Sequence, residues 1–130
     1  MNRAIIAITR NGARLGARLQ ASHPQAELFV LERFAPEAGM QATPFTGELR
    51  EQVARLWGLY HGFAFIMATG IVVRMVAPHL AGKDRDPALV VLDEAGRFAI
   101  SLLAGHLGGA NRLAIELAAA SGGTPVITTA

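Results

Sequence analysis

Apolar residues along the chain follow two alternating patterns, one typical of strands and one typical of helices. Short continuous apolar runs predict strands buried on both faces, at residues 4–8, 27–31, 63–67 and 88–92. Segments in which apolar residues return every three or four positions predict amphipathic helices, at about 13–22, 47–60, 71–76 and 110–120. Thr46 is placed to cap the second of these helices. Strands that alternate with helices predict an α/β domain with a mostly parallel sheet.

The second half of the chain adds one departure from this parallel arrangement. The runs 88–92 and 98–101 are joined only by residues 93–96, a connection short enough for an antiparallel hairpin. Residues 125–127 are a last short strand, whereas 33–44 contains Pro and Gly without periodicity and is predicted to be a surface loop. We therefore expect a single three-layer domain, Rossmann-like or flavodoxin-like, with one antiparallel hairpin.

Composition narrows the class of protein. The chain has 130 residues, of which 52% are hydrophobic and 17% charged, enough for one compact domain with a sizeable core. Its net charge of only +2 argues against nucleic acid as a partner. The absence of cysteine excludes disulfide bonds and thiolate metal sites. No apolar run is long enough for a signal peptide or a membrane-spanning helix, so we expect a cytoplasmic protein without membrane contact.

The loops that lead from strands into helices are the expected place for a ligand. In a parallel sheet, ligands bind beyond the carboxyl ends of the strands. Three such loops carry glycine and polar side chains, at Thr9–Gly12, Ala68–Gly70 and Leu103–Asn111. We expect all three loops to meet at one edge of the sheet.

Three segments in the second half of the chain carry a family resemblance. They are TGIVVRMVAPHLAGKDRDPALVVLDEAGRF, AISLLAGHLGGANRLAIELA and GGTPVITTA, and together they resemble the CbiG family of cobalamin (vitamin B12) biosynthesis. The resemblance implies that residues 1–130 are the amino-terminal domain of a cobalt-precorrin-5A hydrolase, without the middle and carboxy-terminal regions usual in the family. Many family members have serine where this sequence has Ala104, so a hydroxyl at that position is not essential here.

The resemblance also implies a reaction. Water opens the δ-lactone of cobalt-precorrin-5A, and acetaldehyde leaves to give cobalt-precorrin-5B. This chemistry needs proton transfer, stabilisation of an oxyanion, and donors for the carboxylate arms of the tetrapyrrole. No separate cofactor is expected, because the cobalt is carried within the substrate. A carboxy-terminal CbiG-type domain or another cobalamin-pathway enzyme is an expected partner.

Two other functions are alternatives to this hydrolase. One is a non-catalytic corrinoid-binding module that acts together with such a partner. The other is a generic small nucleotide-binding domain, which the length of the family motifs disfavours. The glycine-rich segment is neither a G-x-G-x-x-G motif nor a phosphate-binding loop, and Ser101 lies in no nucleophile elbow.

The segment Gly105-His106-Leu107-Gly108-Gly109-Ala110-Asn111 is the strongest candidate site. Its glycines allow a flat ligand to approach the backbone, and the following helix offers N–H groups to an anion, so Gly105, Gly108 and Gly109 are expected to bind substrate. His106 is the expected general base or acid. Asn111 is the second expected catalytic residue, which orients His106 or contacts the ligand; the alternative is that it caps the helix. The simpler alternative is a tight turn whose histidine bonds to the backbone.

Cationic and polar residues elsewhere complete the expected site. Thr69 and Gly70 are expected to face the same crevice as His106. Arg74, amid apolar neighbours, either clamps a substrate carboxylate or extends to solvent. Lys83 and Asp86 belong to a charged run that is a solvated loop or a lid over the substrate. The four histidines have no spacing typical of a metal site, so no protein-held metal is expected.

Overall fold

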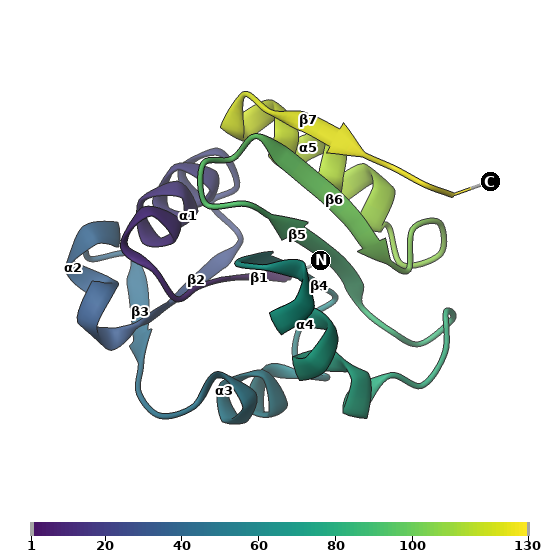
Figure 1. Ribbon diagram of the computed structural model, residues 1–130, viewed down its shortest axis with the longest axis horizontal. Coiled ribbons are helices and arrows are strands. Elements are labelled where there is room, and N and C mark those ends of the chain that lie inside the picture. Colours follow the sequence, from purple (N-terminus) through teal and green to yellow (C-terminus); the bar gives the residue numbers. More distant parts are fainter. Residues whose placement is uncertain (1, 130) are drawn as a thin grey trace.

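The computed structural model describes residues 2–129, and within them seven strands form one sheet in the order β3-β2-β1-β4-β5-β6-β7 (Figure 1). The strands are β1 (Arg3–Ala7), β2 (Glu27–Leu31), β3 (Ala42–Phe45), β4 (Gly62–Ile66), β5 (Ala88–Leu92), β6 (Phe98–Leu103) and β7 (Thr124–Val126). The α-helices are α1 (Arg10–Ser22), α2 (Ala35–Ala38), α3 (Leu49–Leu56), α4 (Thr69–Val76) and α5 (Ala110–Ser121). None of these helices is long and apolar enough to cross a membrane.

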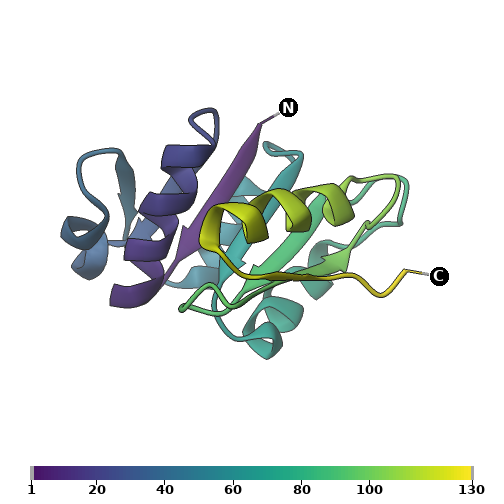
Figure 2. The same ribbon diagram turned by 90° about the horizontal axis from the view of Figure 1, so that it is seen from above.

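Helices cover both faces of the sheet and make three layers. Figure 1 shows α1 and α5 on one face and α3 and α4 on the other, and Figure 2 shows α1 and α5 lying side by side over the strands. Every residue of β4 and of β5 is buried, as their continuous apolar runs predict for central strands. The fold class expected from the sequence, a single α/β domain with a mostly parallel sheet and one antiparallel pair, is confirmed.

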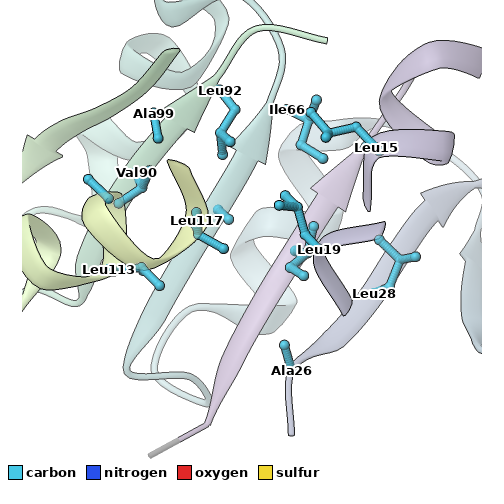
Figure 3. Close-up of a cluster of buried hydrophobic side chains, with 14 of the residues drawn as sticks. Leu15, Leu19, Ala26, Leu28, Ile66, Val90, Leu92, Ala99, Leu113 and Leu117 are labelled. Atoms are coloured by element: carbon cyan, nitrogen blue, oxygen red, sulfur yellow. The ribbon is translucent and has the colours of Figure 1, made fainter. Parts of the chain in front are cut away.

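Side chains of the central strands alternate between two cores. Ala64 and Ile66 of β4 point toward α1 and α5, where they pack with Leu15, Leu19 and Leu117 (Figure 3). Phe63 and Phe65 point the other way, into the core under α3 and α4. Because each fully buried large apolar side chain stabilises the fold by about 1.5–3 kcal/mol, these two cores hold the edges of the sheet, and the loops there, in fixed places.

The antiparallel strand determines where the loops lie. β1, β2, β3, β4 and β5 are parallel to one another, β6 pairs with β5 in the antiparallel sense, and β7 is parallel to β6. In Figure 1 the arrows of β5 and β6 point in opposite directions. The loop after β6 therefore lies at the edge where β1, β4 and β5 begin, here called the amino edge. The opposite edge, where those strands end, is the carboxyl edge.

Two local expectations from the sequence are wrong. Residues 33–44 are not an irregular loop, because a 3₁₀ turn at Glu32–Phe34, helix α2 and most of β3 lie within that region. Pro44 is tolerated in β3 because β3 is an edge strand, where a missing N–H need not break a ladder. Thr46 does not cap α3; Glu48 does, in a capping box with Glu51.

Candidate functional site

The expected site residues fall into two groups at opposite edges of the sheet, which corrects the expectation of a single crevice. Gly105, His106, Gly108, Gly109 and Asn111 lie at the amino edge, because β6 runs antiparallel to its neighbour. Lys83 and Asp86, which precede β5, lie at that edge as well. The two groups are separated by the length of a five-residue strand, roughly 16 Å.

Thr69, Gly70 and Arg74 make up the second group, at the carboxyl edge. Thr69 and Gly70 begin α4 directly after β4. A Cβ atom placed on Gly70 would lie 3.1 Å from Arg74 Nη1, so the guanidinium folds back over the first turn of α4. These three residues do not share a cavity with His106.

A cavity of about 380 Å³ opens at the amino edge beside residues 104–109, which we call the glycine loop. We call it the glycine-loop cavity, and its walls include Trp57, Tyr60, His61, residues 83–87, Leu107 and Gly108. The structure thus brings three expected residues together here, Lys83, Asp86 and Gly108. Sequence reasoning missed Trp57, Tyr60 and His61, because they end the α3 region and carry no motif of their own.

The glycine loop is tightly folded. A Cβ atom on Gly108 would lie 2.5 Å from Ala104 Cβ and 2.9 Å from the Ala104 carbonyl oxygen. Ala104 has φ 60° and Gly109 has φ 85°, both in the left-handed region. Such a compact turn permits only glycine at position 108, so the glycines have a demonstrable conformational role whatever they bind.

Two N–H groups at the start of α5 are occupied. The amide of Ala110 donates to the Ala104 carbonyl at 3.0 Å, and the amide of Asn111 donates to the Gly105 carbonyl at 3.1 Å. The expectation that this helix terminus presents free donors to an anion is therefore wrong for these two groups. These two amides are not available to an anion.

The amide side chain of Asn111 links three parts of the chain. Its Oδ1 accepts a hydrogen bond from Ser101 Oγ at 2.7 Å, and its Nδ2 donates to Thr129 Oγ1 at 3.0 Å. Asn111 is the second residue of α5 rather than its cap, which is Gly109. Among residues 2–129 it forms no hydrogen bond with His106, so two of the roles expected for it, capping and orienting His106, are absent from the structure.

His106 is exposed at the surface of the glycine loop. It does not line the glycine-loop cavity, whose wall includes the following residues, Leu107 and Gly108. Its ring has no hydrogen-bond partner within the part of the chain that the structure describes. Nothing there fixes its tautomer or its orientation, which a general base requires.

Residues 82–86 form a tight turn that displays two cations. Asp86 is buried, and its Oδ1 accepts a hydrogen bond from the Ala81 amide at 2.8 Å, while the amides of Arg85 and Asp86 donate to the Gly82 carbonyl. Asp86 therefore holds the turn together. Lys83 and Arg85 are exposed, and neither forms an ion pair with any residue in the range 2–129. Their charges are available to a carboxylate ligand.

Aromatic side chains form another part of the cavity wall. Trp57 stacks on His79 at 5.3 Å between ring centroids and on Phe63 of the core at 5.5 Å, which holds the indole in place. Burial, with a contribution from the Glu27 carboxylate, raises the pKa of Tyr60 to about 12. The Tyr60 phenol is therefore neutral near pH 7, and its one proton is directed to the Glu27 carboxylate.

His61 at the same wall has a fixed orientation. Its Nδ1 lies 2.7 Å from Asn2 Oδ1, and its backbone amide donates to the Asn2 carbonyl at 3.0 Å. Asn2 Nδ2 in turn donates to the Leu59 carbonyl at 2.7 Å. The sequence offers no motif around either residue, and only the pairing of β1 with β4 brings them together.

A second cavity, of about 340 Å³, lies at the carboxyl edge between the ends of β1, β4 and β5. Its walls are mainly apolar, and its charged groups are Asp93 and Glu94. Thr9 Oγ1 donates to Glu94 Oε2 at 2.7 Å and accepts from the Gly12 amide at 2.9 Å. Its two carboxylates have no lysine or arginine beside them in the lining, whereas the glycine-loop cavity sets Lys83 and Arg85 beside Asp84 and Asp86. A polycarboxylate ligand is therefore repelled more at the carboxyl edge.

Comparison with known proteins identifies the family. The family described as "Cobalamin synthesis G N-terminal" matches residues 51–130. A cobalt-precorrin-5A hydrolase from Priestia megaterium is 40% identical over 129 residues, which are 98% of this chain and 34% of that protein. A cobalt-precorrin-5A hydrolase from Salmonella typhimurium is 42% identical over 127 residues, or 98% of this chain and 35% of that protein. The chain thus spans about a third of the length of these curated relatives.

A solved structure agrees with the sequence relatives. The crystal structure of a cobalamin biosynthesis protein G homolog from Sulfolobus solfataricus matches with a TM-score of 0.70 and 26% sequence identity, covering 98% of this chain and 36% of that chain. Sequence motifs, fold and relatives agree, and the resemblance seen in the second half of the sequence is confirmed. The chain belongs to the cobalamin synthesis G N-terminal family.

Proposed function

We propose that this chain is the amino-terminal part of a cobalt-precorrin-5A hydrolase, and that the carboxylate arms of the tetrapyrrole bind at the glycine-loop cavity. The observation that carries the proposal is the pair of cations, Lys83 and Arg85, neither of which forms an ion pair within residues 2–129; they line a cavity with an aromatic wall, beside Asp84 and Asp86. Charge-assisted hydrogen bonds from such groups suit carboxylates, and Trp57 and Leu107 offer apolar surface to a flat ring system.

The proposed reaction has two steps. Water attacks the lactone carbonyl while a base takes its proton; the ring C–O bond then breaks and the alkoxide takes up a proton. The resulting alcohol loses its proton as the adjacent C–C bond breaks, acetaldehyde leaves, and a proton returns to the macrocycle carbon. Lys83 and Arg85 would stabilise negative charge on the substrate. Cobalt enters as part of the substrate.

The second candidate function is a corrinoid-binding module whose chemistry is completed by another domain or protein. It is favoured by the exposed, unoriented ring of His106 and by the length of the relatives, about three times that of this chain. The two candidates share the same binding site and differ only in which polypeptide supplies the catalytic groups.

Acetaldehyde release separates the candidates. The purified chain is incubated with cobalt-precorrin-5A, alone and as a chimera in which it replaces the matched third of the Salmonella typhimurium relative. Release by the chain alone identifies a hydrolase domain that is active without a partner. Binding without release by the chain, together with release by the chimera, identifies the binding module. If neither form binds the substrate or releases acetaldehyde, the proposed function is wrong.

Charge substitutions at the two edges locate the substrate. We expect Lys83→Ala to weaken binding of cobalt-precorrin-5A about two- to fivefold at low ionic strength, the usual scale for an exposed ion pair, and the difference to shrink with added salt. Arg74→Ala, at the carboxyl edge, is the matched control and should bind like the parent. Titration of both variants at two salt concentrations tests this. Weaker binding by Arg74→Ala alone would move the site to the carboxyl edge, as the clamp hypothesis for Arg74 requires.

A further inference from the structure

We infer that His61, held by Asn2, is the residue that transfers protons in the glycine-loop cavity. The inference rests on the proposed function, since it assigns a role within that reaction. Neither residue belongs to the segments that carry the family resemblance, and the histidine expected from the sequence was His106. The geometry around the two histidines points to His61 instead.

The hydrogen bonds of Asn2 determine the tautomer of His61. Asn2 Nδ2 donates to the Leu59 carbonyl, which can only accept, so the amide oxygen of Asn2 must face His61. That oxygen accepts from the His61 backbone amide at 3.3 Å and lies 2.7 Å from His61 Nδ1. Because an amide oxygen cannot donate, Nδ1 must carry the proton. Nε2 is left with a lone pair and is the nitrogen that can accept a proton.

The backbone fixes the position of this pair as firmly as the side chains do. Arg3 pairs with Gly62 in the β1–β4 ladder, so Asn2 and His61 stand one position earlier on the same two strands. The His61 amide donates to the Asn2 carbonyl, and the His61 carbonyl accepts from the Ala88 amide at 2.9 Å. His61 is therefore anchored to the strands on both sides of β4. His106, on the glycine loop, has no comparable support.

The surroundings of His61 fit proton transfer in this reaction. His61 lines the glycine-loop cavity together with Lys83 and Arg85, which would bind the substrate carboxylates. A histidine whose far ring nitrogen is held by an acceptor side chain is the arrangement that general-base catalysis requires. Nε2 takes a proton from water as the water oxygen bonds to the lactone carbonyl carbon. The imidazolium then gives that proton to the alkoxide released when the ring C–O bond breaks, so protons and electrons balance.

Paired substitutions test the assignment in whichever form, chain or chimera, releases acetaldehyde. We expect His61→Gln to lower single-turnover acetaldehyde release by about a hundredfold or more, the scale for a general acid or base, and to change the dissociation constant less than about threefold. Asn2→Ala should lower turnover roughly tenfold, because the ring loses its orientation but not its chemistry. Asn2→Asp keeps an acceptor for Nδ1 and should recover part of that loss. His106→Gln, the matched control, should turn over like the parent.

A spectroscopic readout covers the case in which a variant loses activity through misfolding. Nitrogen NMR of the imidazole should show Nδ1 protonated and Nε2 unprotonated in the parent chain at a pH where the ring is neutral, and this preference should vanish in Asn2→Ala while the thermal unfolding curve stays cooperative. Normal turnover by His61→Gln, or a large loss confined to His106→Gln, would overturn the assignment of His61 but leave the proposed function standing. An inactive parent in both forms would instead overturn the proposed function, and the assignment with it.

Discussion

Gly108→Ala is expected to lower the free energy of unfolding by about 1–3 kcal/mol and to weaken binding of cobalt-precorrin-5A roughly tenfold. The new methyl group would lie 2.5 Å from Ala104 Cβ and 2.9 Å from the Ala104 carbonyl oxygen, and 3.4 Å from the Asp86 carbonyl oxygen. The first two contacts are too short, and one involves backbone, so the glycine loop must move. Because Gly108 lines the glycine-loop cavity, the wall of the cavity moves with the loop.

Gly109→Ala is the matched control. Apart from its chain neighbours, no atom of residues 2–129 lies within 4 Å of the position its Cβ would occupy, but its φ of 85° strains any residue with a side chain, at about 1–2 kcal/mol. We therefore expect a similar loss of stability and binding within about threefold of the parent. Urea unfolding and substrate titration of both variants separate steric displacement from backbone strain. Parent-like binding by Gly108→Ala would show that the glycine-loop wall does not contact the substrate.

The sequence predicted the central strands and the hairpin well because their signals are local. The runs at 63–67 and 88–92 are apolar at every position, and only a strand covered on both faces needs that pattern. The short connection 93–96 allows only a hairpin, which the pairing of β5 with β6 confirms. Strand β3 was missed because an edge strand with two exposed positions has no apolar run, and Pro44 suggests a loop.

The candidate site was only partly predictable. Lys83 and Gly108 were both expected from the sequence, and the structure brings them to one cavity. The grouping with Thr69 and Gly70 failed because the rule for parallel strands was applied to β6, although the predicted hairpin already reversed its direction. His61 and Asn2 could not be paired from sequence, because 59 positions separate them and only strand register joins them.

Asn111→Ala is the second large effect we expect, and it acts on stability. The substitution removes hydrogen bonds of 2.7 Å to Ser101 Oγ and 3.0 Å to Thr129 Oγ1. Ser101 is buried, so its hydroxyl loses a partner that water cannot readily replace. We expect the free energy of unfolding to fall by about 2 kcal/mol, after a small gain from the better helix propensity of alanine. Chemical denaturation of the chain measures this directly.

Two further variants show whether Asn111 positions the glycine loop or takes part in the chemistry. Thr129→Val removes only the exposed hydrogen bond and should cost less than about 1 kcal/mol. Ser101→Ala as a single substitution should lower the free energy of unfolding. Adding it to Asn111→Ala should lower that free energy little further, because both changes remove the same interaction. A positioning residue shows this coupling, and substrate binding falls with it as the loop loosens. A residue that touches the reacting atoms would behave differently: Asn111→Ala would unfold like the parent, bind substrate normally, and lose turnover about a hundredfold. That outcome would restore the catalytic role expected from the sequence, and the hydrogen bonds to Ser101 and Thr129 predict against it.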